Sequence, residues 1–333
     1  MPSESVVLSK LDEVLAAADV TKKPWEKDEF IPNMDLARRL LEIPIKAGGA
    51  EEQQTGRVAK SLDAWIAFEL RRAGFPLSAV WPRSEEPRVL PADLDPVVDK
   101  IDLALERLAQ FEARLQKYEE EARAKGLKKP APKLHELRPA IRRIGEALPG
   151  STNATILGRF YAKQVDVVVS SWQRGPDVII SGKTQLSSYL KNMNNRYEEA
   201  VGEGKNLRDR YPLASMGFAH LVRSDIFDEE GAFEYLRNQL VRLRQPDGFF
   251  DATMLLVLDW DDKTKTLNPI QDPTRNLTAT RFFTDIVNAL LKYTPVGVHQ
   301  NVREMKEGEP IGGPPTLDEG VSPEEAAAHD AGV

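Results

Sequence analysis

Hydrophobic positions in the second half of the chain alternate between strand-like runs and helical stripes. Apolar runs predict strands at Val165 to Ser171, Val178 to Ser181, Ser215 to Val222 and Ala252 to Asp259. Helical periodicity predicts helices at Ser187 to Arg210, Glu229 to Arg244 and Asn276 to Tyr293. A hairpin followed by helix, strand, helix and strand is typical of an α/β fold, with a mixed sheet flanked by helices.

The N-terminal part of the chain is expected to be helical. Residues 1–50 contain an apolar stripe from Val6 to Ala18 and a short helix, Met34 to Ile43, that should end before Pro44. After Gly48-Gly49, an amphipathic helix is expected at Arg57 to Ala73. These boundaries predict a helical N-terminal region at 1–50 and a main domain at 51–300.

A heptad pattern interrupts the main domain. Apolar residues recur every three or four positions from Asp95 to Lys125, and a second seam runs from Leu134 to Leu148. The Gly- and Pro-containing segment 126–132 lies between them, so residues 93–150 are expected to form an inserted antiparallel helical hairpin. Such an arm could touch DNA, mediate dimerisation or dock a partner.

Composition narrows the classes of function. The formal net charge is −7, which argues against a non-specific nucleic-acid coat protein but not against a locally basic binding face. The chain has no cysteine, and its four histidines are far apart, so zinc sites of the usual spacing are not expected. No membrane-spanning run or signal peptide is recognised, which favours a cytoplasmic protein. Residues 301–333 are expected to form a disordered acidic tail.

The predicted hairpin contains the candidate catalytic side chains. Gln173 to Pro176 form the expected turn. A turn centred on Arg174-Gly175 places Asp166 directly opposite Lys183, at the same end of the hairpin. A carboxylate can hold a hard divalent cation there, and an ammonium group can lie beside an attacking water or a scissile phosphate. This combination suits metal-assisted hydrolysis of a phosphodiester.

The hairpin resembles the PD-(D/E)XK nuclease superfamily, which has the restriction-endonuclease-like fold. In that superfamily an Asp opens one strand and an acid-x-Lys motif closes the next. Here Asp166 and Ser181-Gly182-Lys183 stand in those places. One group of restriction enzymes in the superfamily also has Ser-x-Lys, with the missing carboxylate supplied by a Glu on the following helix. Glu198 and Glu199 lie near that position in this chain.

The resemblance implies a divalent-metal-dependent DNA endonuclease of a restriction or phage-defence system. Asp166 and Glu198 (or Glu199) would hold Mg²⁺ or Mn²⁺, Lys183 would act on the attacking water, and Ser181 would hydrogen-bond a metal-bound water. Cutting both strands of double-stranded DNA favours a homodimer, and defence-system proteins are possible partners.

Two further acids are candidates in this scheme. Asp177, in a literal Pro-Asp, is an alternative metal ligand, although antiparallel pairing puts it at the far end of the hairpin from Lys183. The superfamily can also use a Glu on a helix before the first core strand. Glu69 could be that residue, or it could be a surface glutamate.

Polar residues on the helix that follows the hairpin are the candidates for DNA contacts. They are Lys191, Asn195, Arg196, Lys205 and Arg208. Because asparagine is a poor helix former, a helix that begins only near Met193 is the structural alternative.

Three other functions stay open. Ser181 motivates an inactive nuclease-like fold that binds DNA or a partner. Gly182-Lys183-Thr184 ends like a P-loop, and the segment 254–261 resembles the Asp-ended strand of P-loop proteins. However, Asp177 stands where the first P-loop glycine is needed. A structural adaptor built on the helical hairpin is the third alternative.

Overall fold

The structure is a computed structural model of the chain. It describes residues 4–48, 51–77, 79–82, 154–171, 174–244, 248–270, 276–295 and 297–307, with scattered residues between 110 and 126. The chain divides into two compact units, one of Met1–Glu85 with Asn153–Val333 and one of Glu86–Thr152. The helices and strands named in the figures belong to the first unit. The predicted helical hairpin at 93–150 and the tail after residue 307 fall outside the described residues, apart from those scattered positions.

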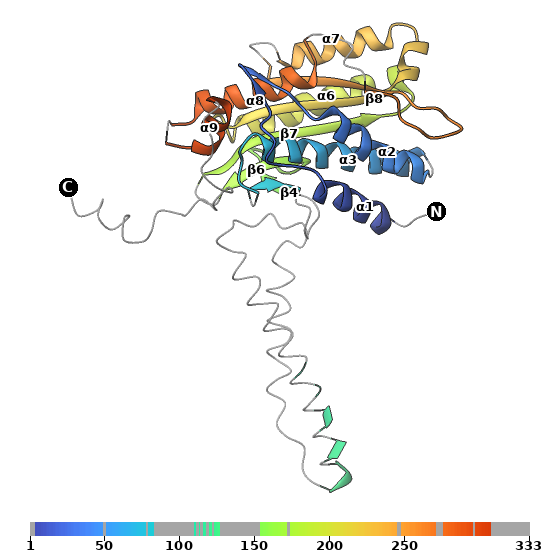
Figure 1. The fold of residues 1–333 in the computed structure, drawn as a ribbon, viewed down its shortest axis with the longest axis vertical. Helices are drawn as coiled ribbons and strands as arrows, with labels where there is room; N and C mark the ends of the chain where they lie inside the picture. Colours follow the sequence, from blue (N-terminus) through green and yellow to red (C-terminus); the bar gives the residue numbers. More distant parts are fainter. Residues whose placement is uncertain are drawn as a thin grey trace, which may run out of the picture. The chain divides into compact units, whose positions relative to one another are not determined.

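A five-stranded mixed sheet forms the centre of the first unit (Figure 1). In spatial order its strands are β3 (Val80–Trp81), β6 (Val167–Ser171), β7 (Gly175–Gln185), β8 (Ser215–Arg223) and β9 (Ala252–Leu258). The pairs β3–β6 and β6–β7 are antiparallel, and β7–β8 and β8–β9 are parallel. Every residue of β9 is buried, as expected for a parallel strand covered on both faces. The predicted α/β class with a mixed sheet flanked by helices is confirmed.

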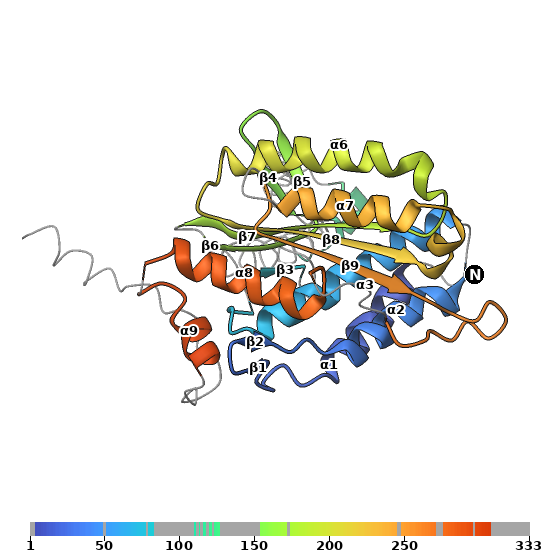
Figure 2. The ribbon, with the colours of Figure 1, turned by 90° about the horizontal axis from the view of Figure 1, so that it is seen from above.

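Helices cover both faces of this sheet (Figure 2). On one face lie α6 (Tyr189–Arg208), which connects β7 to β8, and α7 (Ala232–Arg244), which precedes β9 after the short 3₁₀ helix η2 (Ser224–Asp228). The other face carries α2 (Met34–Ala47), α3 (Glu51–Arg72) and α8 (Ala279–Tyr293). Consecutive parallel strands require such crossover helices. The result is a three-layer arrangement.

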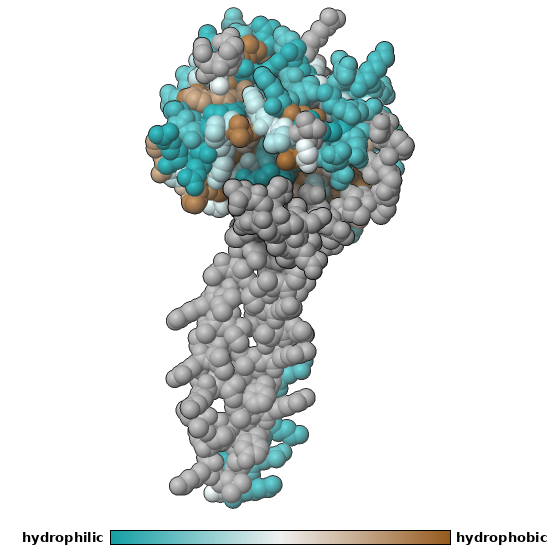
Figure 3. Space-filling model, turned by 90° about the vertical axis from the view of Figure 1, so that its left-hand side faces the viewer, coloured by the Kyte–Doolittle hydropathy of each residue, from teal (hydrophilic) through white to brown (hydrophobic). Residues whose placement is uncertain are grey.

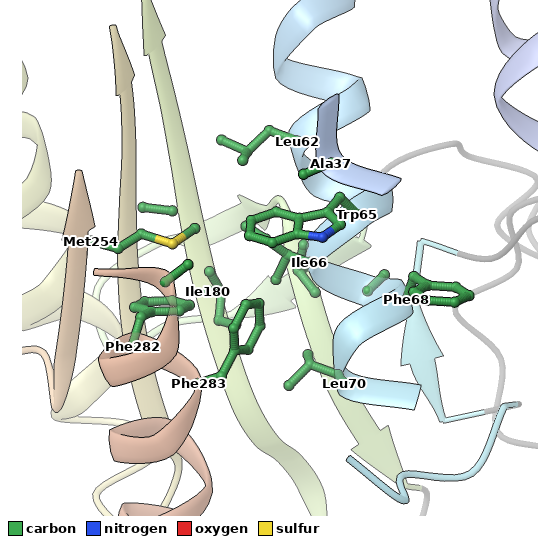
Figure 4. Close-up of a cluster of buried hydrophobic side chains, with 14 of the residues drawn as sticks. Ala37, Leu62, Trp65, Ile66, Phe68, Leu70, Ile180, Met254, Phe282 and Phe283 are labelled. Carbon is green, nitrogen blue, oxygen red and sulfur yellow. The ribbon is translucent and has the colours of Figure 1, made fainter. Parts of the chain in front are cut away.

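The larger apolar core lies between the sheet and α3 and α8 (Figure 4). Trp65 of α3 meets Phe283 of α8 edge to face, with ring centroids 5.5 Å apart. Ile180 of β7 and Met254 of β9 line the sheet side of the same cluster. The helical stripe that predicted α3 is therefore the face that packs against the sheet, and this packing fixes α3 over β7.

The first fifty residues share this core. They form α1 (Glu4–Ala16), the short strands β1 (Trp25–Glu26) and β2 (Glu29–Phe30), and α2. Trp25 and Phe30 are buried with the core, and the Phe30 backbone N–H donates to Thr284 Oγ1 of α8. Val302 of α9 (Gln300–Glu307) is also buried there, although residue 302 lies in the stretch expected to be a tail.

Pro44 does not end α2. The helix continues to Ala47, and the Gly48 N–H donates to the Pro44 carbonyl. Pro44 itself is buried. A proline this close to the C-terminal end removes only its own N–H from the helix, so packing of the last turn outweighs the local rule that predicted an earlier end.

No helix in the described part of the chain is long and apolar enough to cross a bilayer.

Glu69 is neither a surface residue nor part of a site at the hairpin. Its side chain is fully buried and paired with buried Arg72 on the next turn of α3. It also accepts hydrogen bonds from the Asn33 N–H (2.9 Å) and Trp65 Nε1 (3.1 Å). Burial raises the pKa of Glu69 to about 7, although these partners act to lower it. Glu69 therefore joins α2 to α3 through a buried polar cluster.

Replacing Glu69 alone should destabilise the protein more than replacing the pair. Glu69→Met leaves the Arg72 guanidinium buried without a carboxylate, at a cost of about 3–5 kcal/mol. Glu69→Met/Arg72→Met should recover part of that loss, because no unpaired charge stays buried, although the Asn33 N–H and Trp65 Nε1 still lose Glu69 as an acceptor. Urea unfolding of both variants measures the difference. Additive losses in the double variant would show that the two groups are not coupled.

Candidate functional site

The register of the β6–β7 hairpin differs from the predicted one by two residues. Val167 pairs with Ile180 and Val168 with Ile179, so Lys183 does not lie opposite Asp166. The pairing of Ser171 with Gly175 leaves a three-residue loop, and a bulge follows between Val169 and Ser170. A loop longer than two residues and the bulge both change the register that a simple turn would give.

Asp166 still lies at the same end of the hairpin as Lys183. It occupies the bend between β5 (Ala162–Val165) and β6. Its Oδ2 accepts a hydrogen bond of 2.7 Å from the Gly182 N–H. The backbone of Gly182, and not the side chain of Lys183, therefore holds the Asp166 carboxylate in place.

Side chains at the end of β7 alternate between the two helical layers. Ser181 and Lys183 contact acidic residues of α6, on one face of the sheet. Gly182 faces α3 on the other side. This alternation is the two-residue period of a β-strand. Residues 181–183 therefore contact α6 on one face of the sheet and α3 on the other.

On the α3 side, two carboxylates approach Gly182. A Cβ atom at residue 182 would lie 2.9 Å from Asp63 Oδ1 and 3.9 Å from Asp166 Oδ2. Burial, together with the charge of Asp166, raises the pKa of Asp63 well above its usual value. Burial also raises the pKa of Asp166, against the lowering effects of the Gly182 N–H and of Lys183. Both carboxylates are half-buried, so two like charges are held close together where each is only partly hydrated.

On the α6 side, Lys183 forms an ion pair. Its Nζ lies 2.9 Å from Glu199 Oε1, and Arg196 binds the other oxygen of that carboxylate at 3.0 Å. Partial burial raises the pKa of Glu199, but Lys183 and Arg196 outweigh it and the net shift is downward. Lys183 pairs in register with His220 of β8. Burial lowers the pKa of His220 to about 3, so a neutral ring lies beside the lysine.

A second buried acid lies next to Ser181. The Ser181 hydroxyl donates to Glu203 Oε1, and Glu203 Oε2 lies 2.9 Å from Lys163 Nζ of β5. Glu203 is 2% exposed, and its charge contributes to the raised pKa of Asp166. Glu203 thus places a carboxylate beside Ser181, where an acid-x-Lys motif has its acid.

The other predicted acids lie elsewhere. Glu198 is exposed on α6, away from this cluster, while Glu199 belongs to it. Asp177 is buried at the far end of the hairpin, as antiparallel pairing requires, where it binds Arg174 at 3.2 Å and lies 3.5 Å from His299 Nε2. Neither Glu198 nor Asp177 is brought to Asp166 or Lys183.

The candidate DNA-contacting residues are in different states. Arg208 is bound to Asp251 and to the carbonyl groups of Ala214 and Phe249, so it holds the fold together. The other four residues are exposed. Among them, Lys205 is paired with Asp209, and Arg196 is paired with Glu199.

The helix that carries these residues begins at Tyr189 and not near Met193, so its asparagines are helical. Asn194 Oδ1 accepts from the Tyr235 hydroxyl, a tertiary contact that favours helix there.

The P-loop interpretation is wrong on structural grounds. Gly182, Lys183 and Thr184 all lie inside β7, and each pairs with a residue of β8. A P-loop needs these backbone N–H groups free in a loop to surround phosphates.

The site suits a hard cation with a small number of protein ligands. Within the described residues, no three acidic or histidine side chains converge into a ready-made metal cage. Mg²⁺, however, is commonly bound by one or two carboxylates, completed by waters and substrate phosphates. The adjacent, partly desolvated carboxylates of Asp63 and Asp166 fit that description, because a cation between them would remove their repulsion.

Three residues of the site were missed from the sequence: Asp63, Lys163 and Glu203. Asp63 directly follows Leu62 of the apolar stripe of α3, and that position could have drawn attention to a carboxylate beside the sheet. Glu203 and Lys163 carry no distinguishing pattern, since each is one of many charged residues on its element.

No protein-family model, curated protein or solved structure matches the chain.

Neutralising Asp63 should stabilise the protein at alkaline pH. Because the pKa of both Asp63 and Asp166 is raised, ionising the pair costs stability above the unfolded-chain pKa of about 4. Asp63→Asn should therefore melt roughly 2 °C or more above wild type at pH 8. The difference should vanish as the pH falls through the raised pKa range to below about 4, and saturating Mg²⁺ should reduce it at pH 8.

Asp35→Asn is the matched control, because Asp35 is an exposed helical aspartate paired with Arg38. It should not raise the melting temperature. An Asp63→Asn variant that melts below wild type at pH 8 would show that the carboxylate stabilises the fold.

Proposed function

We propose that this protein is a divalent-metal-dependent DNA endonuclease with a PD-(D/E)XK-like core. The observation that carries the proposal is that Asp63 and Asp166 meet at the backbone of Gly182, while the charge of Lys183 acts on both carboxylates from the α6 face of the same strand. The order and direction of β6, β7, β8 and β9, with helices on both faces, support it. So does the position of Asp166 and Lys183 at one end of the β6–β7 hairpin.

Asp63 and Asp166 would hold Mg²⁺ or Mn²⁺. When bound, the cation supplies charge neutralisation at the phosphate and a more acidic water. The reaction would be hydrolysis. A bond forms between the water oxygen and phosphorus while the bond to the leaving sugar oxygen breaks, the water gives its proton to solvent, and the leaving oxygen takes a proton from solvent. Lys183 would orient the water and stabilise the extra negative charge on phosphorus.

Lys183 is bound to Glu199 in this structure, so part of its charge is already neutralised. A phosphate arriving beside Lys183 competes with Glu199 for it. Arg196 holds the second oxygen of Glu199, and can keep that carboxylate in place as Lys183 turns toward substrate.

The acid that replaces the one missing from Ser-x-Lys is Glu203 in this proposal. Its contact with Ser181 puts a carboxylate next to the expected position, although it lies further along α6 than Glu198. Lys163 balances the charge of Glu203. Double-stranded DNA as substrate, a homodimer that cuts both strands and a role in restriction or phage defence are parts of the proposal that come from the superfamily resemblance.

The second candidate function is an inactive nuclease-like protein that binds DNA or a partner. It is favoured by the pairing of both Lys183 and Glu203 with protein side chains of opposite charge. In such a protein these ion pairs would be permanent parts of the fold.

Cleavage of plasmid DNA with Mg²⁺ or Mn²⁺ tests the proposal. Wild type should cut, and Asp166→Ala and Lys183→Ala should each lose about 100-fold or more of the activity because each removes a group that acts on the reacting atoms. Asp177→Asn, at the far end of the hairpin, should retain activity. Circular dichroism melting checks that each variant is folded. Failure of folded wild type to cut several DNA substrates would favour the inactive alternative.

The same assay separates the two candidate glutamates of α6. Glu203→Gln should lose most of the activity, since it removes the charge beside Ser181 and Asp166. Glu198→Gln changes an exposed residue on the same helix and should cut like wild type. The opposite ranking would return the role to Glu198.

A further inference from the structure

The hairpin of β4 (Ala154–Leu157) and β5 carries exposed aromatic residues close to the candidate site. Phe160 is 64% exposed and Tyr161 51% exposed, both in the turn. On the face shown in Figure 3, apolar surface occurs in small patches among hydrophilic residues. Two adjacent exposed aromatic rings on one turn beside the candidate site form a surface on which a planar ligand could stack.

The turn is rigidly held. Asn206 of α6 is fully buried, and its side chain accepts from the Phe160 and Tyr161 N–H groups and donates to the Tyr161 carbonyl. The Arg159 N–H donates to the Asn206 carbonyl. A Cβ atom at Gly158 would lie 2.1 Å from Asn206 Nδ2, so only glycine permits this close approach. The rings thus stand on a fixed support.

The hairpin is also continuous with the site. β5 ends at Val165, immediately before Asp166, and Lys163 of β5 binds Glu203. Phe160 lies six positions before Asp166, which gives a separation of at most about 20 Å in extended chain, the length of about six stacked base pairs. A nucleic acid placed at Asp166 and Lys183 therefore extends within reach of the turn.

Arg159 gives the turn an exposed positive charge that a polyanion can contact, whereas Lys163 is already paired with Glu203. Residues 154–165 contain Arg159 and Lys163 and no acidic residue, in a chain of net charge −7. The Arg159 guanidinium lies 5.7 Å from the centre of the Phe160 ring and 3.6 Å from Asp209, and its side chain is 60% exposed. A cation beside exposed rings is the combination that binds single-stranded nucleic acid through its bases and phosphates.

We infer that Phe160 and Tyr161, with Arg159, form a platform on which unpaired bases of the substrate strand stack next to the cut. This inference rests on the proposed nuclease function and adds a substrate feature to it: the strand is single, or locally opened, on the hairpin side of the site. Stacking is tolerant of sequence, so the platform selects strand state and not a base sequence.

Binding of the full-length protein to single-stranded DNA containing 2-aminopurine tests the inference. Measurements are made with Ca²⁺ in place of Mg²⁺, by anisotropy and by quenching of the 2-aminopurine fluorescence. Phe160→Ala and Tyr161→Ala should each weaken single-strand binding roughly 10-fold and reduce the quenching, because base stacking on aromatic side chains is lost. Binding of a fully paired duplex should change much less.

Phe227→Ala is the matched control, because Phe227 is 51% exposed and lies in η2, outside this hairpin. It should bind single strands like wild type. Unchanged single-strand binding by the two hairpin variants, or equal weakening by Phe227→Ala, would overturn the inference. If wild type cuts DNA while the hairpin variants bind single strands normally, the stacking inference is wrong and the proposed nuclease function is kept. If wild type neither binds nor cuts DNA, the proposed function fails with it.

Discussion

The structure depends on a close approach between α3 and β7 at Gly182. Apolar packing of the α3 stripe, centred on Trp65, brings the helix down onto the sheet. The missing side chain at residue 182 then leaves room for Asp63, and the N–H of the same residue holds Asp166. The hydrophobic core thus forces two carboxylates together against their mutual repulsion. Such stored repulsion is typical of functional sites, where a ligand relieves it.

The sheet distributes the remaining charges around this point. Because side chains alternate along β7, Lys183 and Ser181 face α6 while Gly182 faces α3. Glu199 and Glu203 are one turn apart on α6, so they lie on the same side of the helix and can each meet one of these residues. Lys163, from β5, balances the deeper acid. The site therefore draws on α3, β5, β7 and α6, and none of these elements carries it alone.

The sequence was sufficient for the fold class and for the end of the hairpin at which Asp166 and Lys183 lie. Periodicity identifies β8, β9, α7 and α8 closely, because their faces are buried against a single core. It could not give the register of β6 and β7, since the bulge after Val169 depends on how the loop closes. Nor could it show that Glu203, and not Glu198, contacts Ser181, because that contact depends on how α6 packs against the sheet. Asp63 could not be identified from the sequence, because only its tertiary contact with Gly182 places it beside Asp166.

The most direct test of this account is calorimetric titration of Mn²⁺ into wild type, Gly182→Ala and Gly202→Ala. The alanine methyl at residue 182 must displace the Asp63 carboxylate, whereas Gly202 of α6 is exposed and has open space around it. The account predicts that wild type and Gly202→Ala bind Mn²⁺ equally and that Gly182→Ala binds at least about 10-fold more weakly, as metal sites do when a supporting contact is disturbed. No Mn²⁺ uptake by wild type, or equal binding by folded Gly182→Ala, would contradict it.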